Sequence, residues 1–195
     1  MGRKRATAPA RRIKRSIYII PEGNKTEVEY INLLKDLTRD SDVTLITDPA
    51  STSTSPQALV KRATKRESET KFSEIWIIFD KDDWPPEQIE AVLRWESQGQ
   101  IRHKAMSNPS FEYWLLLHFE EGRELSRVEL KKRLTQHWPN YYESNKGLEA
   151  KKFDLEAIQL AIVRSRARLV SRSSDNQAGS EVHLFVEKLL VLDGA

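Results

Sequence analysis

Short apolar runs alternate with longer segments of helical periodicity through the first 120 residues of the chain. The runs "SIYII" (16–20), "VTLIT" (43–47) and "EIWIIF" (74–79) are short and rich in β-branched residues, which predicts three strands. The run "RHKAM" (102–106) is less apolar than the other three and predicts a short fourth strand. Because the first run is apolar on both faces, it favours a parallel strand that is covered by helices on each side.

The segments that follow these runs carry helix signals. Ser55 and Pro56 are typical of an N-cap and the first helical position, and Asn108 and Pro109 open the segment after the fourth run. The predicted helices are 26–37, 57–68, 86–97 and 108–119. This alternation predicts an α/β fold with a mostly parallel sheet of about four strands and helices on both faces.

The last third of the chain does not alternate between strand and helix patterns, because its periodic segments all predict helices. These segments are 127–138, 149–170 and 180–192. We therefore expect a basic flexible tail over residues 1–15 and a single domain over 16–195. Within that domain we expect an α/β core at about 16–120 and a helical extension at about 121–195.

The amino-acid composition limits which classes of protein this chain can belong to. The apolar share of 38% is adequate for a core, and the chain has no cysteine, so it forms neither disulfides nor a thiolate metal site. The absence of cysteine is consistent with a reducing cytoplasm. No apolar run approaches the length of a bilayer span. We expect a cytoplasmic protein that does not associate with membranes.

The net charge of +3 hides an asymmetry, because the first 15 residues hold seven basic residues and no acid. Subtracting these seven charges leaves −4 for residues 16–195. Such a basic head is either a solvated tail or an electrostatic tether to the phosphates of a nucleic acid. Its basic residues are Arg3, Lys4, Arg5, Arg11, Arg12, Lys14 and Arg15.

Acidic residues follow the first and third predicted strands. Glu22 comes after the first, with Glu27 about one helical turn further on, and Asp80 and Asp82 come after the third. Ligands of open α/β sheets bind outside the carboxyl ends of the strands, so neighbouring first and third strands would bring these carboxylates together. Carboxylate oxygens suit Mg²⁺ or Mn²⁺, and the cation offsets their mutual repulsion. The sequence therefore predicts a divalent metal site at this edge.

A simpler explanation competes with the metal site, because loops are hydrated and the N-termini of helices accommodate negative charge. That explanation is the better one for Glu27 alone, which lies in the first turn of a predicted helix. The combination of Glu22 with Asp80 and Asp82 favours the metal. For Glu112, a further metal ligand and a capping acid near Asn108 are equally good interpretations.

Four segments, "EGNKTE", "IIFDKDD", "SNPSFEYWLLLHF" and "GSEVHLFVEKL", resemble in order the RloB-like family of bacterial defence proteins, from about Ser16 to about Leu192. That family in turn resembles the Toprim fold of topoisomerases, primases and overcoming-lysogenization-defect nucleases. The resemblance implies a metal-dependent nuclease of DNA or RNA in anti-phage defence, beside a separate ATPase. It also implies that Glu22 is a general acid/base or metal ligand and that Asp80 and Asp82 bind Mg²⁺. Glu27 stands one residue later than the second acid of the Toprim turn.

Other interpretations remain open. Lys25, Lys81 and Lys104 could contact phosphate or be solvated lysines. A nucleotidyl- or glycosyltransferase can also carry an Asp-x-Asp pair after a strand to hold Mn²⁺. A non-catalytic alternative is a Toprim-like interaction or regulatory subunit of an ATPase defence complex, which would keep the acids for folding or docking. Loss of activity with a chelator distinguishes the nuclease from the docking subunit.

Overall fold

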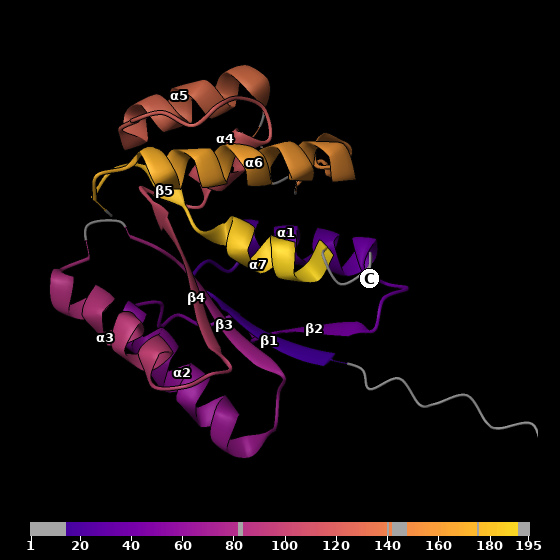
Figure 1. Cartoon of the computed structure of the whole chain (residues 1–195), viewed down its shortest axis with the longest axis vertical. Helices are drawn as coiled ribbons and strands as arrows, with labels where there is room; N and C mark the ends of the chain where they lie inside the picture. The colour runs from indigo at the N-terminus through magenta and orange to yellow at the C-terminus, as the bar shows by residue number, and fades with distance from the viewer. Residues whose placement is uncertain (1–14, 82–83, 140, 142–147, 175, 191–195) are drawn as a thin grey trace, which may run out of the picture.

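The computed structural model (Figure 1) describes residues 15–81, 84–139, 141, 148–174 and 176–190. Its centre is one five-stranded sheet in the order β2-β1-β3-β4-β5. The first four strands are parallel, and β5 runs antiparallel to β4. The strands are β1 (Arg15–Pro21), β2 (Val43–Thr47), β3 (Glu74–Asp80), β4 (Arg102–Asn108) and β5 (Gly179–Ser180). The mostly parallel α/β sheet that the sequence predicts is confirmed, with one strand more than expected.

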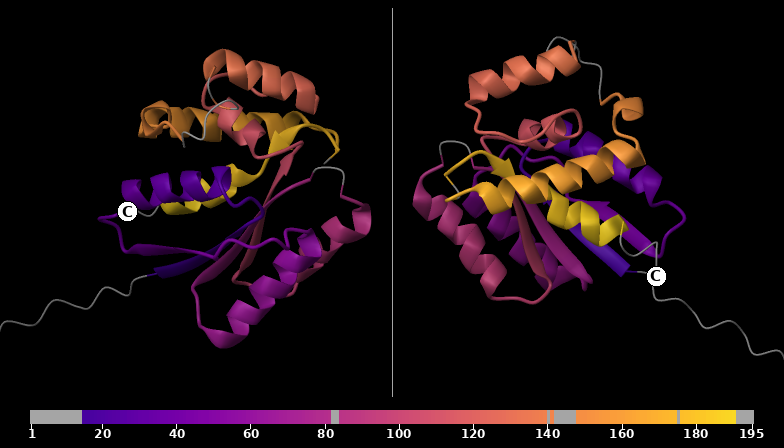
Figure 2. Two further views of the ribbon diagram at one scale, coloured as in Figure 1. Left: turned by 180° about the vertical axis from the view of Figure 1, so that it is seen from behind. Right: turned by 45° about the horizontal axis from the view of Figure 1, so that its top comes forward.

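Helices cover both faces of this sheet (Figures 1 and 2). On one face, α2 and α3 pack against Tyr18, Ile20, Ile77 and Phe79. On the other, α1 and α7 lie next to the sheet, and α4, α6 and α5 continue the helical layer outward. The helices are α1 (Thr26–Leu37), α2 (Pro56–Glu69), α3 (Pro86–Ser97), α4 (Glu112–Leu117), α5 (Arg127–His137), α6 (Leu155–Ser171) and α7 (Val182–Leu190), with a 3-10 turn at Ala150–Lys152.

Successive side chains of each strand point to opposite faces of the sheet, and this alternation gives the protein two hydrophobic cores. Ile17, Ile19, Trp76 and Ile78 point to the face of α1 and α7, whereas their chain neighbours point to the opposite face. Because both faces are covered, the central strands β1 and β3 are apolar at successive positions. This burial fixes the register of the two strands whose carboxyl ends carry acidic residues.

The predicted helix at 108–119 begins later than expected. Asn108 is the last residue of β4 and pairs with Gly179, and its side-chain amide donates to the carbonyl of Gln177. The backbone therefore stays extended at Asn108, and α4 starts at Glu112. The predicted start at 180 is also wrong, because Ser180 belongs to β5 and α7 begins at Val182.

The long helix predicted at 149–170 is divided. Asp154 accepts a hydrogen bond from the backbone N–H of Ala157 at 2.9 Å, which makes Asp154 the N-cap of α6. A 3-10 turn precedes this cap. Among the helices of the described ranges, none is long and apolar enough to cross a membrane.

Candidate acidic site at the carboxyl edge of the sheet

Glu22 and Asp80 meet where β1 and β3 end. The backbone N–H of Glu22 donates to the carbonyl of Ile78 at 2.9 Å, which continues the pairing of the two strands by one residue. The Glu22 carboxylate accepts from the backbone N–H of Asp80 at 2.8 Å and from the indole Nε1 of Trp84 at 3.3 Å. Glu22 is thus fixed against the end of β3 by two donors.

Glu27 returns to the same edge from the first turn of α1. Its side chain is buried, and its Oε1 accepts from the backbone N–H of Gly23 at 3.1 Å. A Cβ atom at residue 23 would collide with the Glu27 carboxylate. The Glu27 carboxylate thus occupies the space that a side chain at residue 23 would fill, and it could keep this position only with glycine there.

Glu112 approaches from the start of α4. Its two oxygens accept from the hydroxyl of Ser110 at 2.6 Å and from that of Tyr141 at 3.0 Å. The Tyr141 hydroxyl also lies 3.2 Å from the hydroxyl of Thr26 in α1. The N-terminus of α4 has no side-chain cap, so the contact of Glu112 with Ser110 joins two side chains. Tyr141 connects this acid to the start of α1.

The four carboxylates influence one another electrostatically. Burial raises the pKa of Asp80 well above its ordinary value, and the negative charges of Glu27, Glu112 and Glu22 raise it further. A hydrogen bond from the backbone of Phe111 opposes this shift. Acids from the loop after β1, from α1, from β3 and from α4 therefore share one edge.

Glu22, after β1, and Glu27, in α1, also bind protons more tightly than usual. Burial raises the pKa of Glu27 from 4.5 to about 7, with a smaller contribution from the charges of Glu112 and Glu22. Burial likewise raises the pKa of Glu22, although its hydrogen bonds to Asp80 and Trp84 act in the opposite direction. Removing net negative charge, by a proton or by a cation, stabilises this cluster.

The donor set fits a hard divalent cation in chemistry and charge, since it consists of carboxylate oxygens. Within the described part of the chain, however, no three His, Asp or Glu side chains are already grouped at metal-binding spacing. Glu22, Glu27 and Glu112 are each held instead by neutral donors of the protein. Asp82, the remaining predicted ligand, lies outside the described residues.

A family comparison adds to this geometry. The model of the RloB-like protein family matches residues 17–189 of the chain. The chain belongs to the RloB-like family. No curated protein and no solved structure matches it. The matched range of this RloB-like protein contains Glu22, Glu27, Asp80 and Glu112.

Two of the predicted phosphate contacts lie near the acids of this RloB-like protein. Lys25 is exposed and occupies the position before α1, between Glu22 and Glu27. Lys81 directly follows Asp80, and its ammonium donates to the side chain of Asn176. These lysines border the acidic edge.

Two other predicted contacts are engaged elsewhere. Arg15 is the first residue of β1 and pairs with Glu74, so it belongs to the sheet and not to the tail. The Lys104 ammonium lies 2.7 Å from Glu181 and is largely buried, which removes it as a free phosphate contact. The remaining predicted contacts, Arg3, Lys4, Arg5, Arg11, Arg12 and Lys14, lie outside the described residues.

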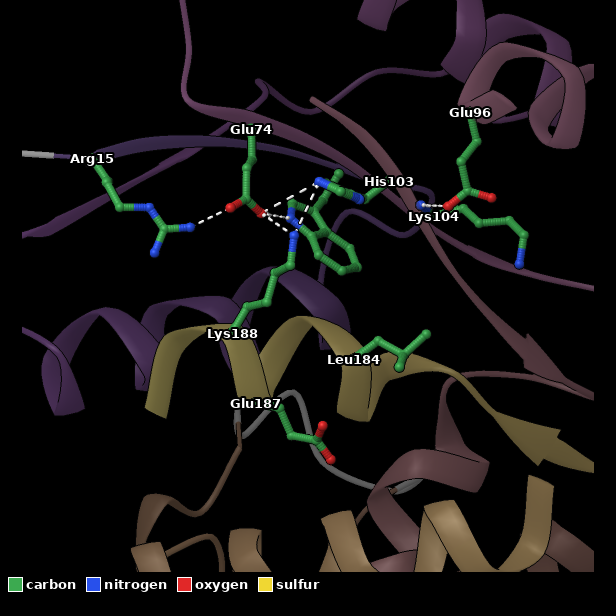
Figure 3. Close-up of a pocket in the computed structure, with 9 residues that line it drawn as sticks. Arg15, Glu74, Glu96, His103, Lys104, Leu184, Glu187 and Lys188 are labelled. Atoms are coloured by element: carbon green, nitrogen blue, oxygen red, sulfur yellow. Dashed lines mark hydrogen bonds and ion pairs between the residues drawn. The ribbon is translucent and has the colours of Figure 1, made fainter. Parts of the chain in front are cut away.

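A cavity of about 730 Å³ opens at the opposite, amino end of the sheet, between α7 and strands β3 and β4 (Figure 3). Its charged groups have partners of opposite sign: Glu74 pairs with Arg15 and with Lys188 inside the cavity. Lys104 and Glu187 pair with residues outside it. Lys188 also lies 5.6 Å from the ring centroid of Trp76, on which His103 stacks. The acidic edge is the better candidate site, because like charges are held together there, whereas this cavity is electrostatically balanced.

Several residues that contact the acids are not predicted from the sequence, among them Gly23, Trp84 and Tyr141. Gly23 and Trp84 stand next to predicted acids along the chain, so proximity was an available signal. Tyr141 lies 115 residues from its partner Thr26, and no local pattern indicates that contact.

Proposed function

We propose that this RloB-like chain is a metal-dependent nuclease of Toprim type that acts in bacterial anti-phage defence with a separate ATPase. The observation that carries the proposal is the position of Asp80, which is held beside Glu22, Glu27 and Glu112 at the carboxyl edge of the sheet. Like-charged groups in a low-dielectric environment destabilise one another, so a fold that retains them favours a cationic ligand.

We assign Asp80 and Glu112 to a Mg²⁺ or Mn²⁺ ion, with Glu27 and Asp82 as further ligands, of which Asp82 lies outside the described residues. When bound, such an ion supplies positive charge to a phosphate oxygen and lowers the pKa of a bound water. Oxygen ligands alone are typical of these cations. Small side-chain rotations are needed, since each acid now accepts hydrogen bonds from the protein.

Glu22 is the proposed proton acceptor. The N–H of Asp80 and the indole of Trp84 orient its carboxylate, and burial makes it a stronger base than an exposed glutamate. A positioned carboxylate with a raised pKa accepts a proton from an attacking water and returns it to the leaving oxygen. Lys25 and Lys81 are the proposed contacts of the phosphates that flank the cleaved bond, and Lys81 would exchange its present bond to Asn176 for one of them.

Cleavage of labelled DNA and RNA, single-stranded and duplex, tests the proposal. We expect cleavage with Mg²⁺ or Mn²⁺ and none with a chelator. Asp80→Asn preserves shape but removes a ligand charge, so we expect its rate to fall at least about 100-fold. The matched control is Asp36→Asn in α1, where the carboxylate is 76% exposed and pairs with the neighbouring surface residue Arg39.

If both Asp80→Asn and Glu22→Gln still cleave at the wild-type rate, the reaction takes place at another site. If the isolated chain does not cleave, the assay is repeated with the ATPase partner. An inert complex of the two proteins would contradict the nuclease proposal.

A second candidate function is a non-catalytic subunit of an ATPase defence complex. It is favoured by the hydrogen bonds that already satisfy Glu22, Glu27 and Glu112, and by the lack of a preformed three-ligand group among the described residues. In that case the acids serve the fold or the docking of a partner. The two functions differ in metal binding, which only the nuclease requires.

A further inference from the structure

Trp84 differs from the other tryptophans of the chain in its packing. The other four are at most 3% exposed and belong to the two hydrophobic cores, namely Trp76, Trp95, Trp114 and Trp138. Trp84 is half-buried, and within the described residues it belongs to neither core and stacks on no other ring. Full burial of an indole stabilises a fold, so a fold that leaves one partly in water forgoes that contribution. Core packing therefore does not account for the position of this ring.

Contacts on both sides hold Trp84 at the acidic edge. Its indole Nε1 donates to one oxygen of Glu22 at 3.3 Å, and the other oxygen accepts from the backbone N–H of Asp80. One carboxylate therefore connects the indole to the end of β3. On the other side, Pro85 and Pro86 restrict the backbone, because a proline fixes its own φ and limits the residue before it. The ring is held in place before a ligand arrives, which lowers the entropic cost of binding.

The surroundings of the ring indicate the chemistry of its ligand. The carboxylate that holds the indole also contacts Asp80, which we assign to a divalent cation. The backbone N–H of Trp84 donates to the carbonyl of Lys81, which we assign to a phosphate. A ligand that lies on the ring therefore carries a phosphate close to a flat apolar group. Nucleotides combine these two groups, and every nucleobase has a face that stacks on an aromatic side chain.

We propose that Trp84 is the stacking platform for one base of a single-stranded nucleic acid whose backbone passes along the acidic edge. This inference rests on the proposed nuclease function and adds the class of substrate to it. In a duplex each base lies between its neighbours, so its face reaches the indole only after the base has left the helix, at a cost in stacking and pairing energy. Single strands of DNA or RNA present their bases without that cost.

Oligonucleotide binding by Asp80→Asn tests the contact, because the proposed function expects this variant to retain the ring but not to cleave. Short DNA and RNA strands are titrated with Mg²⁺ present. Adding Trp84→Ala should weaken the binding of either single strand about fivefold or more. It should leave the binding of an abasic strand and of a blunt duplex of the same length unchanged. The matched control is Val128→Ala on α5, whose valine is 79% exposed and which should change none of these affinities.

Trp84→Phe separates stacking from the hydrogen bond to Glu22. Phenylalanine keeps a flat ring but has no N–H group, so we expect it to retain most of the single-strand affinity that Trp84→Ala loses. In the chain with Asp80 intact, Trp84→Phe should slow cleavage through Glu22 while its affinity changes little. Fluorescence gives an independent readout, because the other four tryptophans are buried. A single strand should quench the emission of Asp80→Asn, and much less that of the same protein with Trp84→Phe.

Several outcomes would overturn the inference. They are a Trp84→Ala variant that binds single strands as tightly as its parent, an equal loss of affinity for the abasic strand, and a chain that binds no oligonucleotide. An effect of Trp84→Ala that is confined to association with the ATPase would overturn it too. These readouts do not depend on cleavage. A chain that stacks bases through Trp84 but never cleaves, with the ATPase present, would contradict the nuclease proposal and not this inference.

Discussion

Glu27 reaches back across the turn that follows β1, and its carboxylate occupies the space that a side chain at residue 23 would fill. This placement buries the acid beside Asp80 and Glu112. The fold therefore determines how tightly Glu27 holds its proton. Gly23 and Glu27 are coupled, because a larger side chain at residue 23 would displace the Glu27 carboxylate from its present position.

The pH dependence of stability should report this burial. The pKa of Glu27 rises from 4.5 to about 7 on folding, so the folded chain holds a proton that the unfolded chain releases. The stability that depends on this proton is present below pH 4.5 and is lost as the pH rises through about 7. With a chelator present, Glu27→Gln should match the wild type near pH 4.5. Near pH 8 its free energy of unfolding should be higher by up to about 3 kcal/mol.

Denaturant unfolding at both pH values measures this difference. The control is Glu87→Gln, because Glu87 lies exposed in the first turn of α3. A Glu27→Gln variant that loses stability equally at both pH values would show that its carboxylate is not protonated in the fold.

Asp80 should determine the response of the protein to metal. A ligand that binds only the folded chain stabilises it by about 2.7 kcal/mol at a hundred times its dissociation constant. We expect Mn²⁺ to raise the unfolding temperature of the wild type and of Asp36→Asn, but to raise that of Asp80→Asn much less. Without metal, Asp80→Asn should be at least as stable as the wild type above pH 7, because it removes like-charge repulsion. Equal stabilisation of all three proteins by Mn²⁺ would argue against a metal site.

At the scale of elements, the start of α2 illustrates a local signal that the structure retains. The Ser55 hydroxyl accepts from the backbone N–H of Ala58 at 3.3 Å, and Pro56 occupies the first turn. Ser55→Ala should lower the free energy of unfolding by about 1 kcal/mol. Ser53→Ala, in the same loop but outside the cap, should have little effect. A loss of similar size in both variants would assign the effect to the loop and not to the cap.

The short strand β5 depends on α6 for a buried hydrogen bond. The Ser165 hydroxyl is fully buried and donates to the carbonyl of Ser180 at 2.6 Å. Ser165→Ala leaves this carbonyl poorly satisfied, so we expect a loss of about 1–2 kcal/mol in denaturant unfolding. Ser171→Ala, which removes an exposed hydroxyl at the end of the same helix, is the control. Equal stability of the two variants would mean that β5 does not need this contact.

At the scale of the whole molecule, charge is distributed between a basic N-terminal segment and a mildly acidic body. If the segment contacts phosphates, deleting residues 1–14 should weaken nucleic acid binding and flatten its salt dependence. Its six basic residues set an upper limit of about five units on the change in the slope of log affinity against log salt for duplex DNA. Binding isotherms at several salt concentrations give the slope, and an unchanged slope would assign the segment no role in binding. The predicted division of residues 16–195 into a core and an extension stays a prediction.

Local patterns along the sequence determined the order and class of most elements. The apolar runs of β1 and β3 predict strands that are buried on both faces, because covering both faces of a sheet requires apolar residues at successive positions. The periodicity of α1 and the cap of α2 likewise depend only on residues within a few positions of each other. Parallel pairing then places Glu22 and Asp80 at one edge, since both follow directly on strands.

The tertiary structure alone decided the features that depend on distant parts of the chain. Asn108 ends β4 because it pairs with Gly179, and Glu112 meets Tyr141 across 29 residues. Arg15 enters the sheet because Glu74 stands beside it, although its neighbours in sequence suggest a tail. Such contacts join residues that no local window includes, and their energies outweigh local preference only after the chain has folded.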